Sequence, residues 1–225
     1  MRRRNVTAMI AAAPLARIAR AEAPVSLSPA EVLLFETPHL AALPPAPLRL
    51  DYAFRREEAG KEPVEDSIRL LIGAPGAEGR RDVHPEFLTG PRALSYPPAQ
   101  GFRGNPLLLF ALDRDAREMS AATGGSMVWF RNRIRRAFAE AAELHATEIV
   151  FDGRRVAATE IAIAPFGGEP RARRYQARRF EFVLSEAVPG GVHTIRTTLP
   201  AVADAGAVVE RIVFTGVTPL PERGG

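Results

Sequence analysis

The stretch that decides the fold is residues 105–146, which read NPLLLFALDRDAREMSAATGG followed directly by SMVWFRNRIRRAFAEAAELHA. Asn105 can cap free N–H groups with its side-chain oxygen, and Pro106 suits the first helical position, where its missing donor costs nothing. The Gly124-Gly125 pair adopts positive φ at little cost and is expected to end this helix. Ser126 can then cap a second one. The stretch therefore predicts a helical hairpin.

Both predicted helices carry an apolar stripe at helical spacing. The first stripe is Leu109, Leu112, Ala116 and Met119, and the second is Met127, Phe130, Ile134, Phe138 (or Ala137), Ala141 and Leu144. Between the stripes, Asp113 and Arg117 are four residues apart, as are Arg114 and Glu118. Opposite charges at this spacing pair on an exposed helix face, so we expect two ion pairs there.

The second predicted helix holds the densest arginine cluster outside the N-terminus. Arg131 and Arg135 lie one turn apart, and Arg133 and Arg136 project from other polar positions. Guanidinium groups bind phosphate and carboxylate bidentately, so this surface and Trp129 form the predicted ligand- or partner-binding site. In the alternative, the arginines are solvated or paired with carboxylates elsewhere, and Trp129 packs under a loop or strand.

Strand-like sequence lies on both sides of the hairpin. The predicted strands are LRLDYAFR and VEDSIRLLIG before it, then TEIVF, RVAATEIAIAPF, RRYQARRFEFVLSEA, VHTIRTTL and AGAVVERIVFTGV after it. Asp152-Gly153 supplies the positive φ of a tight turn between the third and fourth. Short connections of this kind predict an α+β fold: an antiparallel sheet of about six to seven strands with the two-helix hairpin packed on one face.

A curved version of this sheet, wrapped around the helices, would leave an apolar groove. The aromatic residues expected on its inner face are Tyr52, Phe54, Phe180 and Phe182. In one interpretation they line a ligand groove. In the other they form an ordinary packed core.

The N-terminus, MRRRNVTAMIAAAPLARIARAEAP, resembles a bacterial export signal. Three arginines precede a mildly apolar run, and Ala19-Arg20-Ala21 forms an A-x-A site, so we predict cleavage before Glu22. The consecutive arginines favour the twin-arginine type. The alternatives are a mitochondrial transit peptide and a basic tail retained by a cytoplasmic protein.

The rest of the chain divides by composition into three segments. Residues 22–47 are rich in proline and predict a strap or linker, with one short helix over 29–35. Residues 48–218 predict a single α+β domain, and residues 219–225 a flexible tail. No run of the sequence is long and apolar enough to span a membrane.

The charge balance depends on the predicted signal. The full chain has 30 basic and 26 acidic residues, but residues 1–21 hold five of the arginines and no acid, so the mature chain has 25 basic against 26 acidic residues. A near-neutral protein lacks the positive field that nucleic-acid binding requires, and we expect no nucleic-acid partner. The absence of cysteine excludes disulfides, thiolate nucleophiles and cysteine-based zinc sites.

The sequence contains no recognisable catalytic constellation. Its four histidines, at positions 39, 84, 145 and 193, lie far apart and lack metal-ligand spacing. H-E-x-x-H, G-x-S-x-G and phosphate-loop motifs are all missing. Asp113 and Asp115, two apart on a helix, are expected to point in different directions. We therefore predict no metal and no cofactor, and no catalytic residue is assigned.

These observations favour an exported, non-catalytic binding or scaffold protein of the cell envelope. Its predicted partner is an apolar or anionic ligand, such as a lipid, or another protein. The alternative is a periplasmic hydrolase built on His84 and carboxylates that the sequence does not assign. The sequence gives no oligomeric state.

Overall fold

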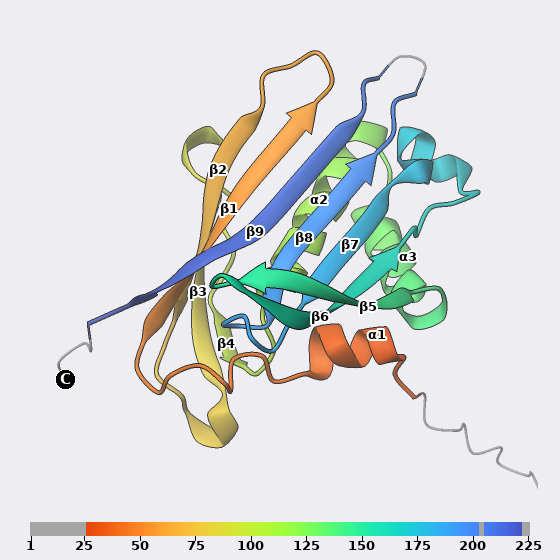
Figure 1. The fold of residues 1–225 in the computed structure, drawn as a ribbon. Coiled ribbons are helices and arrows are strands. Elements are labelled where there is room, and N and C mark those ends of the chain that lie inside the picture. The colour runs from red at the N-terminus through yellow and green to blue at the C-terminus, as the bar shows by residue number, and fades with distance from the viewer. Residues whose placement is uncertain (1–25, 203–204, 222–225) are drawn as a thin grey trace, which may run out of the picture.

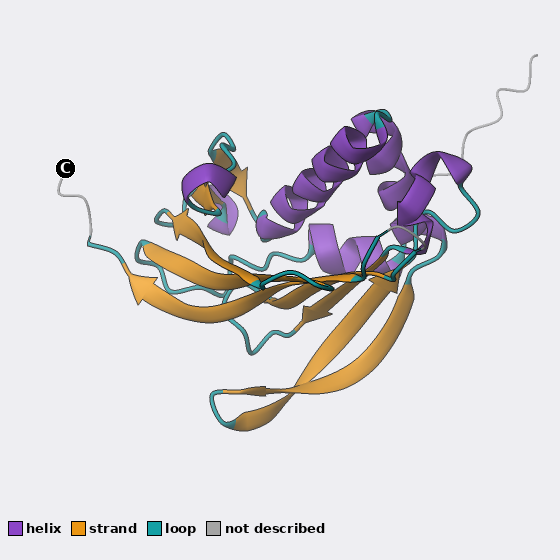
Figure 2. Cartoon of the chain, turned by 90° about the horizontal axis from the view of Figure 1, so that it is seen from above, coloured by secondary structure: helices purple, strands orange, loops and turns teal. Residues whose placement is uncertain are grey.

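The computed structural model describes residues 26–202 and 205–221. Within these residues the chain forms a nine-stranded sheet in the order β4-β3-β2-β1-β9-β8-β7-β6-β5, with helices on one side of it (Figures 1 and 2). Every neighbouring pair of strands is antiparallel. The α+β class, the antiparallel sheet and the helical hairpin on one face are confirmed.

The strands are β1 (Leu48–Glu58), β2 (Val64–Ile72), β3 (Arg81–Phe87), β4 (Ala99–Phe102), β5 (Glu143–Phe151), β6 (Arg154–Ile163), β7 (Arg179–Leu184), β8 (Val192–Leu199) and β9 (Val208–Pro219). The helical segments are α1 (Pro29–Glu31), the π-helical turn η1 (Val32–Glu36), α2 (Leu107–Thr123) and α3 (Met127–Glu140). Three 3-10 segments, η2 (Ala77–Gly79), η3 (Gly90–Arg92) and η4 (Pro170–Ala177), lie in connections. No helix in the described ranges is long and apolar enough to cross a bilayer.

The prediction of six to seven strands was wrong, because β3 and β4 lie in a stretch whose sequence suggests irregular structure with at most one short strand. Pro85 lies inside β3. Proline is normally excluded from strand interiors because it cannot donate a backbone hydrogen bond to the neighbouring strand. It is tolerated because β4 pairs only with Arg81 and Val83, which leaves Pro85 at an edge on that side. β4 itself is only four residues long.

The predicted end of the second helix was also wrong. α3 ends at Glu140, and β5 begins at Glu143, paired with Ala162 of β6. The β5–β6 ladder runs on without interruption to Phe151. Hydrogen bonding along this ladder outweighs the helix propensity of the alanine-rich segment, and it places Leu144 on an exposed strand instead of in the core.

The start and end signals of the hairpin are confirmed. The Asn105 Oδ1 accepts from the Leu107 N–H at 3.0 Å, Gly124 ends α2 at φ +69°, and the Ser126 hydroxyl accepts from the Trp129 N–H. Asn105 also donates to the Tyr52 hydroxyl and to the carbonyl of Gly190, which anchors the start of α2 to the sheet side.

One member of the predicted α2 stripe was wrong. Ala116 and Met119 are buried as expected, but Leu109 is 44% exposed, and Leu107 and Leu108 are buried in its place. With α2 anchored at its start, the first turn directs Leu107 and Leu108 toward the core and Leu109 away from it. Leu109 is therefore an apolar side chain on the outer face of α2.

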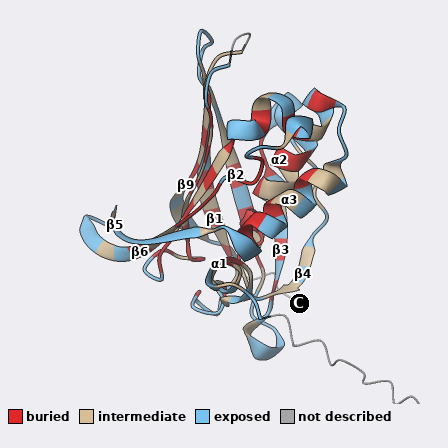
Figure 3. Cartoon of the chain, turned by 90° about the vertical axis from the view of Figure 1, so that its right-hand side faces the viewer, coloured by how far each residue is buried: buried red, intermediate tan, exposed pale blue. Residues whose placement is uncertain are grey.

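The aromatic residues of the predicted sheet groove form a packed core instead. Tyr52, Phe54, Phe180 and Phe182 are each at most 3% exposed. Buried positions recur along the strands that lie beside the helices (Figure 3). Phe138 of α3 packs against Phe182 with ring centroids 5.5 Å apart, so side chains fill this space. The groove interpretation was wrong for these four residues.

The proline-rich segment packs onto the domain. Its predicted short helix is confirmed by α1 and η1, and Leu34 and Leu40 of this segment are buried. Ser28 caps α1, and its hydroxyl also donates to the Phe138 carbonyl at the end of α3. The segment therefore lies against the helical hairpin. The predicted signal and its cleavage site before Glu22 lie outside the described residues, as do residues 222–225 of the predicted tail.

Candidate functional site

A pocket of about 620 Å³ lies on the outer side of the helical hairpin, where α2 and α3 meet the α1–η1 segment and the loop before β4. Its apolar lining includes Leu27, Phe35, Leu109, Leu112, Ile134 and Phe138. Leu27 is 48% exposed and Leu109 is 44% exposed. Large apolar side chains that are exposed within a hollow, as these two are, are typical of a binding surface. We refer to this hollow as the outer pocket.

Aromatic contacts form the walls of the outer pocket. Phe35 meets Phe138 edge-on at a centroid distance of 5.5 Å, and Tyr96 stacks on Phe110 at 4.7 Å. The Tyr96 hydroxyl donates to the Phe110 carbonyl at 3.1 Å, and burial raises the pKa of this hydroxyl. The walls are therefore held by contacts of their own and do not need a ligand to form them.

The rim of the outer pocket carries charges of both signs. Asp113 accepts from Arg117 and Arg131; burial alone would raise its pKa, but these two hydrogen bonds hold it below the usual value. Arg135 also lines the pocket, and no carboxylate of the described chain lies within ion-pair distance of it. Glu31 and Glu36 lie on the opposite wall, where the Glu31 carboxylate accepts from the Ser28 N–H.

The structure divides the predicted binding residues into two groups. Arg131 and Arg135 reach the outer pocket, and the other three do not. Arg133 pairs with Glu169 at 2.7 Å, and Arg136 pairs with Glu140 at 2.8 Å on the same helix.

Trp129 stacks on Phe166 at 6.0 Å and meets Phe130 edge-on at 4.9 Å. Phe166 belongs to the loop that follows β6, so the position of Trp129 is that of the alternative interpretation, beneath a loop. Phe166 therefore stacks on one face of the Trp129 ring.

The apolar lining could have been suspected from the sequence. LLLFAL at positions 107–112 is apolar all around the helix. Such a segment is either buried on more than one side or leaves one apolar side uncovered by the rest of the protein. The sequence does not say which side of this helix faces the sheet. The hydrogen bonds of Asn105 to Tyr52 and Gly190 fix that side in the folded chain.

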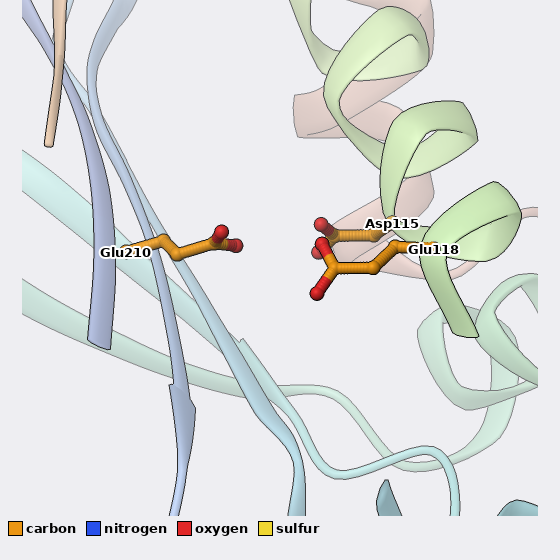
Figure 4. Close-up of side chains that lie close together, drawn as sticks. All are labelled: Asp115, Glu118 and Glu210. Carbon is orange, nitrogen blue, oxygen red and sulfur yellow. The ribbon is translucent and has the colours of Figure 1, made fainter. Parts of the chain in front are cut away.

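A second cluster of charged residues, which the sequence did not suggest, lies between α2 and the sheet. The carboxylates of Asp115, Glu118 and Glu210 converge there, with oxygens within 4.8 Å of one another (Figure 4). Asp115 and Glu118 come from α2, and Glu210 comes from β9. Asp113 points to the outer pocket instead, so the predicted divergence of Asp113 and Asp115 is confirmed.

Three guanidinium groups already neutralise these carboxylates. Arg178 bonds Asp115 at 3.0 Å and Glu210 at 3.2 Å, Arg56 bonds Glu118 and Glu210, and Arg114 lies against all three acids. Burial alone would raise the pKa of Glu210, but Arg114, Arg178 and Arg56 together lower it to about 2. A cation here would have to displace guanidinium partners from buried carboxylates. We therefore interpret this buried ion network as structural.

The histidines give no catalytic grouping in the described structure. His84 is exposed on β3, and no serine or carboxylate of the described residues hydrogen-bonds to its ring. His39 is held by structure instead: its Nδ1 accepts from the Asn105 N–H at 3.2 Å, and burial lowers its pKa. The described residues therefore place no catalytic partner at His84, the residue on which the hydrolase alternative was built.

Comparisons with known proteins add little. No family model matches the chain, and no curated protein matches it. Among solved structures, the chain is similar to the LolA superfamily protein NE2245 from Nitrosomonas europaea, at 10% identity over 86% of this chain and 96% of that one, with a TM-score of 0.24. A TM-score this low carries no functional argument, so the candidate site stands on this chain's own geometry.

Proposed function

We propose that this chain is a non-catalytic binding protein that holds the apolar part of a small ligand in the outer pocket. The observation that carries the proposal is the exposure of Leu27 and Leu109 into a hollow with aromatic walls. Its volume of about 620 Å³ lies within the range of roughly 300–1,000 Å³ that small-molecule sites occupy. Covering these side chains with a ligand would remove apolar surface from water, which favours binding.

Arg131 and Arg135 are proposed to contact the ligand where it passes the α3 rim. Long arginine stems cover apolar surface while their charged ends stay in water. Arg133, Arg136 and Trp129 are left out of the proposed contact because their partners lie elsewhere in the fold.

Export to the periplasm is part of the proposal and is supported only by residues 1–21 of the sequence. The ligand would then come from the cell envelope. An intact mass of the native protein that begins at Glu22 in a periplasmic fraction supports export. A cytoplasmic chain that retains Arg2, Arg3 and Arg4 contradicts it.

The binding proposal is tested by titration with phenylnaphthylamine, a neutral apolar fluorophore whose emission rises in apolar surroundings. We expect the wild-type chain to bind it, and Leu109→Gln to weaken binding about tenfold, because one buried leucine contributes about 1.5 kcal/mol or more. Val128→Gln is the matched control, since Val128 is 59% exposed on α3 and does not line the pocket. No binding by the wild type, or equal loss in both variants, contradicts the proposal.

A further inference from the structure

We infer that the ligand is a single-chain amphiphile with an anionic head. This head lies near Arg103 and Arg80, outside the outer pocket and on the side away from α3. The inference rests on the proposed function and adds the chemical class of the ligand and its direction in the site. It depends on a second hollow next to the outer pocket and on the charges that the two hollows carry.

The second hollow has a volume of about 450 Å³ and lies between η1, the start of α2 and the segment that contains β4. Phe35, Glu36 and Leu109 line both hollows. Because these three residues line both hollows, the two hollows adjoin at Leu109, and we refer to them together as the groove. A linear molecule can therefore place its chain in the outer pocket and its end in the second hollow.

The chemistry of the lining changes along this groove. The outer pocket is mainly apolar, whereas the lining of the second hollow includes Arg80, Arg103 and the polar residues Gln100 and Asn105. Arg103 is exposed, and among the described residues no carboxylate lies within ion-pair distance of it. An apolar cleft that ends at an unpaired guanidinium is complementary to a chain that ends in a carboxylate or phosphate.

Arg80 can add a second donor. Its Nε lies 3.5 Å from Glu78, and its Nη1 donates to the Gly101 carbonyl at 3.3 Å. Both partners of the Arg80–Glu78 pair are about half exposed or more, and exposed pairs of this kind are weak. An anionic head can therefore replace Glu78 at Arg80 at little cost.

The α3 end of the groove is less suited to an anion. Arg131 is already bound by Asp113, whose own negative charge lies on the same rim. Glu36 lies where the two hollows join and disfavours an anion at that point, so an anionic head is favoured beyond it, toward Arg103. Arg135 is the competing cation, and the experiment includes it for that reason.

The experiment compares three amphiphiles with the same twelve-carbon chain as competitors of bound phenylnaphthylamine: dodecanoate, dodecanol and dodecyltrimethylammonium. All are used at mildly alkaline pH, the two ionic amphiphiles below their micelle concentrations and dodecanol below its solubility limit. We expect dodecanoate to bind the wild type about tenfold more tightly than dodecanol, and the cation more weakly than both. In the double variant Arg80→Gln, Arg103→Gln, the ratio of dodecanoate to dodecanol affinity should fall to about one while dodecanol affinity is unchanged.

Arg154→Gln is the matched control. Arg154 is exposed at the β5–β6 turn, lies in neither hollow and forms no ion pair within the described chain. This variant should keep the wild-type ratio.

Three results would overturn the inference, and they differ from one another. Equal wild-type affinity for dodecanoate and dodecanol would show that the site does not recognise an anionic head, but it would leave the proposed apolar site intact. Loss of the ratio in Arg135→Gln, with the Arg80 and Arg103 variant unaffected, places the head at α3. Failure of the fluorophore and all three amphiphiles to bind overturns the proposed function together with the inference.

Discussion

The two faces of α2 differ in whether their side chains have protein partners. On the inner face, Asp115 enters the buried ion network, in which three guanidiniums and three carboxylates bond one another. On the outer face, two residues away, Asp113 faces a rim where Leu109 is open to solvent and Arg135 lacks a carboxylate partner within the described chain. The denser cluster of charges is therefore a structural feature, because its charges already pair with one another. The surface that lacks a protein partner is the better candidate for a ligand.

The largest expected effect comes from breaking the inner network. Glu210→Gln removes the carboxylate that Arg56, Arg114 and Arg178 share, and it leaves three guanidiniums in the network with only two carboxylates. We expect the free energy of unfolding to fall by about 3–5 kcal/mol, measured by urea denaturation. Glu140→Gln is the control, because it breaks only the solvent-exposed pair with Arg136, and we expect little change. A Glu210→Gln variant as stable as the wild type would show that the network does not stabilise the fold.

The same network predicts a loss of stability in acid. The pKa of Glu210 is about 2 in the folded chain against an ordinary value of 4.5, so its contribution is complete above pH 4.5 and is lost as the pH falls toward 2. The depressed pKa of Glu210 contributes about 3 kcal/mol to the free energy of unfolding above this range. Burial raises the pKa of Asp115, so its effect has the opposite sign and partly offsets the loss.

The measurement is the free energy of unfolding as a function of pH, for the wild type and for Glu210→Gln. We expect the curve of the variant to be flatter between pH 4.5 and 2. Parallel curves would mean that Glu210 has no depressed pKa in the folded chain.

The outer face should show the reverse pattern, in which binding changes and stability does not. Leu109→Gln replaces a side chain that is 44% exposed, so we expect the free energy of unfolding to stay within about 0.5 kcal/mol of the wild type. The affinity for phenylnaphthylamine should nevertheless fall. A large loss of stability in thermal and urea denaturation would instead make Leu109 a core residue and weaken the comparison.

The smallest expected effect concerns the rim. Arg131 and Arg117 both bond Asp113 and hold its pKa below the usual value. In Arg131→Gln the pKa of Asp113 should rise toward the usual value, because only Arg117 remains, and NMR titration of the carboxyl carbon would measure this. Arg133→Gln is the control, since Arg133 pairs with Glu169. An unchanged pKa of Asp113 in Arg131→Gln would show that Arg131 is free to bind another anion.

Local signals predicted much of the fold. The Asn105, Gly124 and Ser126 end signals and the alternation of strands such as β1 are properties of short segments, so they can be recognised in the sequence. β3 could not be recognised, because Pro85 is allowed only by the short pairing of β4. The end of α3 was missed for a similar reason, since β6 supplies the ladder that makes residues 143–146 a strand.

The candidate site was predictable only in part. Arg131 and Arg135 share a flank of one helix, and their spacing gave that correctly. The ion network joins Asp115, Arg178 and Glu210, which are far apart in sequence, and no local pattern links them. The outer pocket forms only when the α1–η1 segment folds back onto α2 and α3. This is a tertiary contact that no local sequence pattern predicts.

The most direct test of the proposed ligand site is a crystal structure of the chain grown with dodecanoate. We expect the acyl chain to lie in the outer pocket, in contact with Phe35 and Leu109, with its carboxylate directed toward Arg103. An acyl chain found between the sheet and the helices, with Tyr52 and Phe182 displaced, would contradict it.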